Sequence, residues 1–446
     1  MEGKMARASN LESVSTKLQR IAQLAQEDRQ RVLVSLAHHI DIELLREAYR
    51  RTRKDGAPGV DGQTAASYEE NLEENLQSLL DRFKSGRYQA PPVRRVYIPK
   101  GSDPSKTRPI GVPTFEDKVL QRVVAMVLEA VYEQDFLACS YGFRPGRSAH
   151  HAIGDLRQIL MTMGGGWVLE ADIEGYYENL DPSHLRVFLD QRVRDGVLRR
   201  SLDKWLKAGV MEEGILSHPT TGTPQGGVIS PLLSNIYLHK VLDEWFETTV
   251  QPRLQGQAFL IRFADDFVLV FQMESDARRV LEVLPKRFGR YGLRLHPDKT
   301  RLTRFERPRK GESRKAPQPE APRSFDFLGF THYWEKSRRG NWMVKRKTAS
   351  DRITRFLRRL NLGCRGNRHG PMAWQHGQVL SKLRGHYGYY GITGNSKSLR
   401  SVHNRAKRIW RKWLSRRSRK SNLNWQRFNA LLERYPLPNP RICQAV

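Results

Sequence analysis

The sequence predicts an α+β fold, in which strands and helices alternate in the middle of the chain and helices dominate its last third. Three observations predict it: apolar residues recur at helical spacing near the N-terminus, short β-branched and aromatic runs follow, and helical spacing returns beyond Trp342. With 446 residues, the chain has room for two or three domains with a substantial core.

The N-terminal part is expected to be helical over about Leu11–Arg53, because its apolar positions follow helical spacing up to the turn-rich segment 55–62. A strand is predicted at Val93–Pro99 from its β-branched and aromatic residues, and a helix at Glu116–Tyr132. A further strand, Trp167–Asp172, is entered through a run of glycines.

A hairpin is predicted from Phe259–Ala264 and Phe267–Phe271, with a tight turn between them. Segment 306–322 is rich in proline and charge, cannot bury a core, and is expected to form an exposed loop or linker. Beyond Trp342 the chain is expected to be helical. In its clearest helix the apolar residues share one face, Leu399, Val402, Ala406, Ile409 and Trp413, and other faces carry Arg400, Arg405, Arg408 and Arg411.

The positive charge lies almost wholly in the last third of the chain. Residues 301–446 carry 36 Lys and Arg against 7 Asp and Glu, a net charge of +29, whereas residues 1–300 have a net charge of +1. This excess would repel itself unless a polyanion lay against it, so we expect a nucleic-acid partner, with a membrane surface as the competing polyanion. Binding through phosphates should weaken as salt rises.

No apolar run approaches the roughly 20 residues that span a bilayer, and the N-terminus lacks the apolar core of a secretion signal. The three cysteines, Cys139, Cys364 and Cys443, are far apart and form no CxxC pair. The sequence therefore predicts neither a disulfide framework nor a cysteine zinc site, and we expect a soluble protein of the cytoplasm.

Three carboxylates occupy positions that are costly for an unpaired charge. Asp172 ends an apolar strand, and Asp265 and Asp266 form the turn of the apolar hairpin. With no cysteine or clustered histidine, such carboxylates suit a hard, oxygen-seeking cation such as Mg²⁺. Two such ions about 4 Å apart support in-line phosphoryl displacement, the chemistry of a polymerase. The alternative is that the Asp-Asp pair is only a turn.

Glycine- and proline-containing segments favour the catalytic alternative. Thr223–Asn235 is a loop whose glycines allow close approach of the backbone to a ligand, and it runs directly into a helix. Together with Arg108–Pro113 and Tyr141–Gly146, it resembles the fingers and palm of reverse transcriptases, specifically those encoded by group II introns, which are also called maturases. The resemblance extends from about Gly56 to near the C-terminus.

The resemblance implies that Asp172, Asp265 and Asp266 bind two catalytic Mg²⁺ ions and that dNTPs are the substrates. The family turn is usually Tyr-Ala-Asp-Asp, whereas this chain has Phe263 at the first position. The aromatic ring is kept and a hydroxyl is lost, so the expected metal ligands are unchanged.

The resemblance also implies a nucleotide site. Tyr177 matches the aromatic steric gate, whose ring would collide with a ribose 2′-hydroxyl, and this implies DNA synthesis; the alternative is that Tyr176 or Tyr177 packs in the core. Arg108 matches the fingers arginine that grips the triphosphate, since guanidinium donates paired hydrogen bonds to phosphate. The other candidates are Lys100 for the triphosphate, and Gln225 and Gly226 in the loop against template and nucleotide.

Lys299 resembles the palm lysine proposed to protonate the leaving pyrophosphate, with a solvated lysine beside Asp298 as the alternative. Phe325–Phe330 resembles the apolar segment that closes the palm, and its rings are expected in the core. Segment 383–395 is close to the family's maturase signature, where glycines permit tight turns and rings either stack on bases or pack internally. The candidate RNA-binding residues are Arg384, His386, Tyr387, Arg408, Arg411 and Lys412.

The implied architecture is a right-hand polymerase, with the fingers and palm of the reverse transcriptase fold followed by an all-α basic thumb, known as domain X. Residues 1–90 are expected to form an N-terminal helical extension and the start of the fingers, and residues 91–335 the fingers and palm. Residues 336–420 would form the thumb, and residues 421–446 a short C-terminal segment interpreted as a DNA-binding remnant.

The function implied by this resemblance is that of an RNA-directed DNA polymerase, which copies intron RNA into DNA and assists intron splicing and mobility. The expected partners are group II intron RNA, an RNA template with a DNA or RNA primer, and target DNA, which would bring this bacterial protein to the nucleoid. The cysteine spacing fits no HNH endonuclease, so no second-strand cleavage is expected. The alternatives are a retron-type or diversity-generating reverse transcriptase and a non-catalytic splicing maturase.

Overall fold

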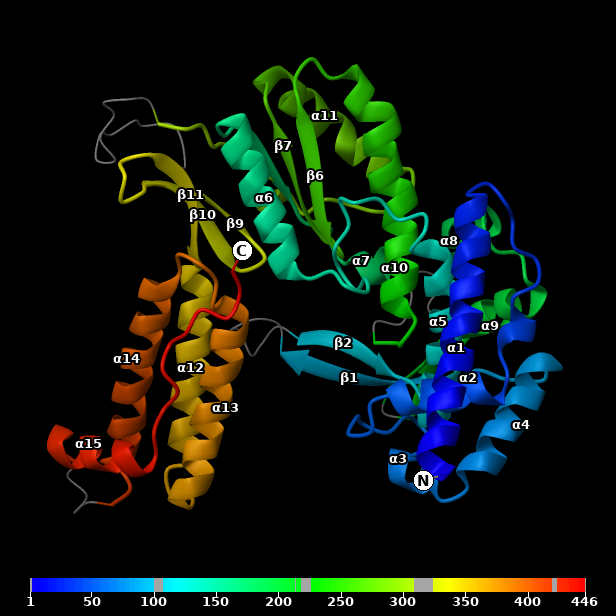
Figure 1. The fold of residues 1–446 in the computed structure, drawn as a ribbon, viewed down its shortest axis with the longest axis horizontal. Coiled ribbons are helices and arrows are strands. Elements are labelled where there is room, and N and C mark those ends of the chain that lie inside the picture. The colour runs from blue at the N-terminus through cyan, green and yellow to red at the C-terminus, as the bar shows by residue number, and fades with distance from the viewer. Residues whose placement is uncertain are drawn as a thin grey trace. The chain divides into compact units, whose positions relative to one another are not determined.

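The computed structural model describes residues 2–99, 107–212, 214–217, 226–308, 324–418 and 423–445, with side chains from Val14 onward (Figure 1). Contacts between residues divide the chain into two compact units. The first comprises residues 1–148, 171–267 and 278–301, and the second comprises residues 149–170, 268–277 and 302–446.

The first unit is mainly helical, and the long apolar helix α5 lies at its centre. The helices of this unit are α1 (Glu2–Glu27), α2 (Ile42–Arg51), α3 (Ala65–Glu69), α4 (Leu72–Lys84), α5 (Phe115–Tyr132), α7 (Tyr176–Asn179), α8 (Pro182–Asp190), α9 (Gly196–Lys207) and α10 (Ser230–Leu238). The Thr114 side chain caps α5 by accepting a hydrogen bond from the Asp117 amide. Helices α1, α2 and α10 all contact α5, which is why nearly every face of α5 is apolar and buried.

A four-stranded sheet in this unit has the order β2-β1-β4-β5. Strand β1 (Val93–Pro99) pairs antiparallel with β2 (Thr107–Val112), with Ile98 opposite Arg108. On its other side β1 pairs parallel with β4 (Val210–Glu212), which forms a hairpin with β5 (Ile215–Ser217).

A second four-stranded sheet has the order β6-β7-β3-β8. Its strands are β6 (Ala258–Phe263), β7 (Asp266–Phe271), β3 (Trp167–Ala171) and β8 (Arg301–Arg304), and the neighbouring helices in sequence are α6 (Ala149–Met163) and α11 (Glu274–Gly289). Gly166 enters β3 with a φ of 144°, and a Cβ there would lie 2.3 Å from the Phe271 carbonyl oxygen. Only glycine fits where these two backbone segments approach each other so closely.

The second unit combines a three-stranded antiparallel sheet, of order β11-β10-β9, with a helical bundle. Its remaining elements are β9 (Ser324–Phe327), β10 (Phe330–Lys336), β11 (Trp342–Thr348), α12 (Ser350–Gly366), α13 (Met372–Tyr390), α14 (Ser396–Leu414) and α15 (Trp425–Arg434). Helices α12, α13 and α14 lie side by side, in yellow to orange in Figure 1. Their shared core includes Leu383, Leu399, Trp410 and Phe428.

Most elements predicted from local pattern are confirmed. The N-terminal helices, β1, α5, β3 and the β6-β7 hairpin occur within a few residues of the predicted positions. The rings of Phe325, Phe327 and Phe330 are buried as expected. Most of the proline-rich segment 306–322 lies outside the described residues.

The prediction that the chain is helical directly beyond Trp342 is wrong for its first seven residues. Trp342–Thr348 forms β11, which pairs with β10 over its whole length. Its buried positions alternate, at Val344, Arg346 and Thr348, as in a half-buried strand. Charged residues interrupt the alternation of apolar and polar residues in this segment, so hydrophobicity alone did not indicate a strand.

Two details of the predicted bundle also differ. Gly385 and Gly388 lie inside α13 and make no turn; the chain turns after Tyr390, and Gly394 takes a φ of 91°. In α14 the deeply buried aromatic residue is Trp410, whereas Ile409 and Trp413 are only partly buried. Among the described residues, none of the helices is long and apolar enough to cross a bilayer.

Candidate active site

The turn of the β6-β7 hairpin presents two carboxylates. Ala264 has a φ of 57°, a left-handed backbone that is uncommon for a residue with a Cβ atom. Asp265 follows in the turn, and Asp266 begins β7 and is exposed. In the sheet β7 lies beside β3, and Asp172 comes directly after β3. The three predicted acids therefore come from two neighbouring strands.

The Asp265 carboxyl is influenced by charged groups from distant parts of the sequence. Burial raises the pKa of Asp265 above its ordinary value, and the negative charge of Asp172 raises this pKa further. The positive charge of Arg108 acts in the opposite direction. The charges of Asp172 and Arg108 therefore both interact with the Asp265 carboxyl.

The predicted lysine also reaches this place. The segment after α11 returns to β3, where the His296 amide donates to the Asp172 carbonyl at 2.8 Å and Ile173 pairs with Leu295. This pairing brings the Lys299 ammonium to the Asp172 carboxylate, with 2.5 Å between Nζ and Oδ2. The Lys299 side chain thus pairs with Asp172 while remaining 54% exposed, and its catalytic role stays a prediction.

The neighbouring tyrosines after Asp172 have different environments. Tyr176 is 3% exposed, and its hydroxyl donates to the Ser234 carbonyl of α10 at 3.0 Å. Tyr177 packs against Tyr176 with ring centroids 5.2 Å apart. Burial raises the pKa of Tyr177, the charge of Asp265 raises this pKa further, and Arg108 lowers it. Tyr176 is thus the packed ring, and Tyr177 is the half-buried one that interacts with the charge of Asp265.

The glycine-containing loop around Gly226 packs closely against β2, the strand that carries Arg108. Gly226 has a φ of 118°, and a Cβ there would lie 2.5 Å from the Gly111 carbonyl oxygen and 2.6 Å from the Ile110 side chain. Gly226 therefore allows a close approach to β2, whereas the predicted approach of this loop to a ligand stays a prediction. Lys100 and Gln225 lie outside the described residues.

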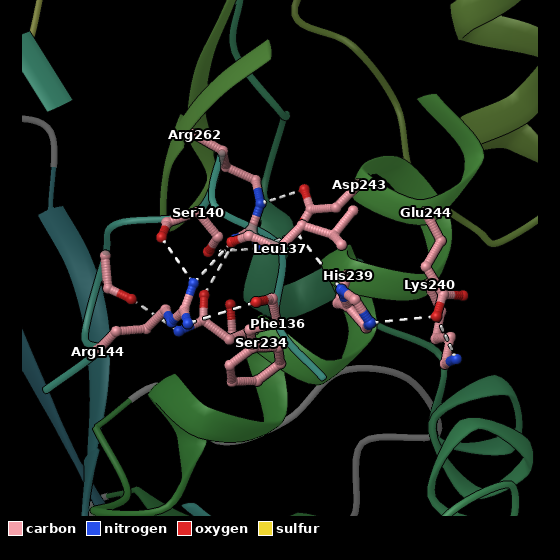
Figure 2. A network of polar contacts seen from close by, with 12 residues as sticks. Phe136, Leu137, Ser140, Arg144, Ser234, His239, Lys240, Asp243, Glu244 and Arg262 are labelled. Atoms are coloured by element: carbon pink, nitrogen blue, oxygen red, sulfur yellow. Dashed lines mark hydrogen bonds and ion pairs between the residues drawn. The ribbon is translucent and has the colours of Figure 1, made fainter. Parts of the chain in front are cut away.

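A buried ion pair supports the backbone of the acidic turn (Figure 2). Arg262 and Asp243 are both fully buried, with Arg262 Nε 2.7 Å from Asp243 Oδ1. The same guanidinium donates to the Ala264 carbonyl at 3.1 Å, directly before Asp265. Its other donors reach Asn235 Oδ1 at 3.0 Å and Ser140 Oγ at 2.8 Å. All five hydrogen bonds that Arg262 donates go to buried acceptors. They hold the backbone directly before Asp265 in place.

The Tyr141–Gly146 segment is anchored to the same turn. Asn235 Nδ2 donates to the Gly142 carbonyl at 2.7 Å, and a Cβ at Gly142 would lie 2.3 Å from the Ala264 amide nitrogen. Arg144, also drawn in Figure 2, donates to the Ser140 carbonyl at 2.9 Å and pairs with Glu133 at 2.9 Å. Sequence reasoning missed Arg262 and Asp243; the available signal was an arginine inside an apolar strand.

Comparison with known proteins identifies the protein family of this chain. The profile of the family described as "Reverse transcriptase (RNA-dependent DNA polymerase)" matches residues 98–332. That match covers more than half of the chain. The chain belongs to the reverse transcriptase family.

Among three curated relatives of this reverse transcriptase, two carry intron-related names and Protein YkfC does not. Protein YkfC of Escherichia coli is 35% identical over 353 residues, which is 70% of this chain and 86% of that protein. Group II intron-encoded protein LtrA of Lactococcus lactis subsp. cremoris is 36% identical over 228 residues, 50% of this chain but only 37% of that protein. Nuclear intron maturase 2, mitochondrial, of Arabidopsis thaliana is 27% identical over 175 residues, 31% of this chain and 24% of that protein. These names confirm the predicted relation to group II intron maturases.

The residues of this reverse transcriptase suit a hard divalent cation in their chemistry. Within the described ranges, no three His, Cys, Asp or Glu side chains form a group that could hold a metal ion. Asp172 and Asp265, both half-buried, are the members of the expected ligand set whose negative charges repel each other. A cation bound by carboxylate oxygens would relieve that repulsion, and oxygen donors suit Mg²⁺.

The six candidate RNA-binding residues of this reverse transcriptase fall into two groups. Arg384, Arg408 and Lys412 are exposed, and the Arg411 guanidinium lies 4.2 Å from the Trp425 ring centroid. His386 is 6% exposed and Tyr387 2%, and the Tyr387 hydroxyl lies 3.0 Å from His403 Nδ1. The two buried rings therefore follow the packing alternative, because they fill the space inside the bundle and do not present a face for stacking.

Proposed function

We propose that this member of the family is an RNA-directed DNA polymerase that copies intron RNA into DNA. One observation carries the proposal: Asp265, in the turn before β7, and Asp172, directly after β3, come from neighbouring strands of one sheet, and their negative charges interact with each other and with Arg108. An anionic pair with a cationic side chain opposite is the arrangement needed to bind metal ions and a triphosphate together. Mg²⁺ held by Asp172, Asp265 and Asp266 would polarise the attacking 3′-hydroxyl and neutralise charge on the departing pyrophosphate.

The other side chains have roles in binding and orientation. Arg108 grips the triphosphate through paired hydrogen bonds, and Gly226 lets the loop backbone lie against template and nucleotide. Tyr177 excludes the ribose 2′-hydroxyl. Lys299, released from its ion pair with Asp172, is placed to give a proton to the leaving pyrophosphate. Lys100 and Gln225 keep their proposed places beside the triphosphate and the template.

The strongly basic residues 301–446 support binding of intron RNA, and RNA binding in turn supports a role in splicing. Their net charge of +29 suits a phosphate backbone, and exposed Arg384, Arg408 and Lys412 are the proposed contacts. Relatives bear the words "maturase" and "group II intron-encoded" in their names. Target DNA is the third proposed partner, with nucleoid association when the protein acts on it.

The test is primer extension by the purified full chain on an RNA template, with dNTPs and Mg²⁺. We expect DNA products that disappear with a chelator and return with added Mg²⁺. If wild-type protein extends no primer but accelerates splicing of a group II intron RNA, the polymerase proposal fails and the non-catalytic maturase replaces it.

We expect Tyr177→Ala to reduce the preference for dNTP over rNTP by about ten-fold or more, because the aromatic ring no longer collides with the 2′-hydroxyl. The ratio of kcat/KM values for the two nucleotides, measured on one template, gives the effect. Tyr176→Phe is the matched control, since it removes only a buried hydroxyl, and it should keep the wild-type preference. An unchanged preference in Tyr177→Ala would refute the steric gate.

A further inference from the structure

A buried polar network links α5 to the glycine loop that precedes α10. Its four members are almost fully buried and come from three separate segments: Tyr88 after α4, Asp117 and Gln121 on α5, and Trp205 on α9. The Tyr88 hydroxyl and the Trp205 indole both donate to Asp117 Oδ1, the latter at 2.7 Å. Gln121 Nε2 donates to the other carboxylate oxygen, Asp117 Oδ2, at 3.1 Å.

The bond to Asp117 determines which way the Gln121 amide faces. An ionised carboxylate only accepts hydrogen bonds, so Gln121 must turn its NH₂ group toward Asp117. Its carbonyl oxygen then faces the loop, where it accepts from the Val228 amide at 2.8 Å and from the Ile229 amide at 3.4 Å. Burial raises the pKa of Asp117 to about 6, which still leaves it mostly ionised at neutral pH.

The start of α10 depends on this external acceptor. The residue at its N-cap position, Ile229, has no side chain that can accept a hydrogen bond from the first amides. Helix N-termini leave backbone amides that need such an acceptor. The Gln121 carbonyl supplies an acceptor from α5 to the two residues directly before Ser230, because it accepts from the amides of Val228 and Ile229.

The loop is enclosed on two sides at this point. A Cβ at Gly227 would lie 3.0 Å from Gln121 Oε1, and a Cβ at Gly226 would lie 2.5 Å from the Gly111 carbonyl. Gly111 belongs to β2, the strand that also carries Arg108. A change in the Gln121 amide therefore moves the loop backbone relative to Arg108.

We propose that Asp117 and Gln121 are positioning residues for the nucleotide site: Asp117 orients the Gln121 amide, and the Gln121 carbonyl sets the backbone that follows Gly226. The inference rests on the proposed function, since the loop binds nucleotide and template there. Neither residue contacts substrate; both act through the loop, so their loss raises KM for dNTP more than it lowers kcat.

Two single variants and their combination test the orientation. Asp117→Asn keeps an oxygen for Tyr88 and Trp205 but turns an NH₂ group toward the Gln121 NH₂ group, which makes the glutamine flip. Gln121→Glu sets one carboxylate against another. In the double variant the new amide donates to the new carboxylate, whose second oxygen accepts again from Val228 and Ile229.

We expect each single variant to raise KM for dNTP about ten-fold and the double variant to return it to near the wild-type value. Hydrogen exchange of the Val228 and Ile229 amides should accelerate in each single variant and recover in the double. Tyr88→Phe is the control for stability alone, because it removes a donor to Asp117 Oδ1, the oxygen that Gln121 does not contact. Its Tm should fall, while KM for dNTP and the exchange rates of the Val228 and Ile229 amides should remain at their wild-type values.

The outcomes separate this inference from the proposed function. Active wild-type protein, with unchanged KM and exchange in both single variants, overturns the positioning role and leaves the polymerase intact. An equal KM increase in Tyr88→Phe would also overturn it, since a general loss of stability would then explain the effect. If wild-type protein extends no primer, the proposed function fails, and unchanged exchange at Val228 and Ile229 alone still decides against the positioning role.

Discussion

Replacement of both Asp265 and Asp266 by alanine should reduce primer extension on an RNA template by at least about 10³-fold. The two carboxylates are proposed ligands of Mg²⁺, whose stabilisation of transition-state charge amounts to several kcal/mol, and each ~1.4 kcal/mol changes the rate about ten-fold. Single-turnover extension at saturating dNTP measures the loss in the chemical step.

The same variant should be at least as stable as the wild-type protein. The pKa of Asp265 is raised by burial and by Asp172, so folding disfavours its charged form. For an acid with a raised folded pKa, the contribution to stability falls as pH rises from the ordinary pKa through the folded one. Alanine removes that cost at neutral pH, so Tm should be equal or higher.

Thermal unfolding with Mg²⁺ separates metal binding from folding. Mg²⁺ should raise the Tm of the wild-type protein and leave that of the Asp265→Ala/Asp266→Ala variant unchanged, since only a ligand bound to the folded state stabilises it. Glu282→Ala, an exposed acid on α11, is the matched control and should retain both activity and the Mg²⁺ response. Extension at the wild-type rate by the double variant would overturn the proposed role of the turn.

The elements that local patterns define could be predicted from the sequence. Val93–Pro99 and the β6-β7 hairpin combine β-branched or aromatic residues with clear turn residues, so their assignment needs no knowledge of distant contacts. The candidate acids were found for the same reason, because Asp265 and Asp266 interrupt apolar strands. Charge at a costly position is a signal that sequence alone carries.

Contacts between distant segments could not be predicted in this way. Arg262 interrupts an apolar strand, but nothing in the local sequence marks Asp243 and Asn235 as its partners, because the three form one network only when β6 meets α10 and the residues that follow it. The Gln121 carbonyl at the start of α10 depends on a similar meeting. In β11 the alternation was present, but Arg346 is buried among apolar residues, and hydrophobic pattern cannot anticipate a buried arginine.

Asp243→Ala should destabilise the protein by about 3–5 kcal/mol, because it leaves the buried Arg262 guanidinium without its counter-charge. Both side chains are fully buried, so water cannot replace the lost carboxylate. The free energy of unfolding in urea measures the effect. Lys286→Ala is the matched control: it breaks an exposed ion pair with Glu282, and such pairs contribute about 0–1 kcal/mol. A similar small loss in Asp243→Ala would contradict the importance of the pair.

The combined variant Arg262→Met/Asp243→Leu then distinguishes stability from positioning. Replacing a buried ion pair by apolar residues of similar size often restores stability, because neither charge has to be desolvated. Methionine cannot donate to the Ala264 carbonyl or to Asn235, however, so the turn before Asp265 loses its anchor. We therefore expect the unfolding free energy to rise above that of Asp243→Ala but to stay below wild type, because Ala264, Asn235 and Ser140 lose a buried donor. Primer extension should stay at least about ten-fold below wild type. Recovery of both would mean that Arg262 only stabilises the fold; recovery of stability alone would mean that it also orients the acids.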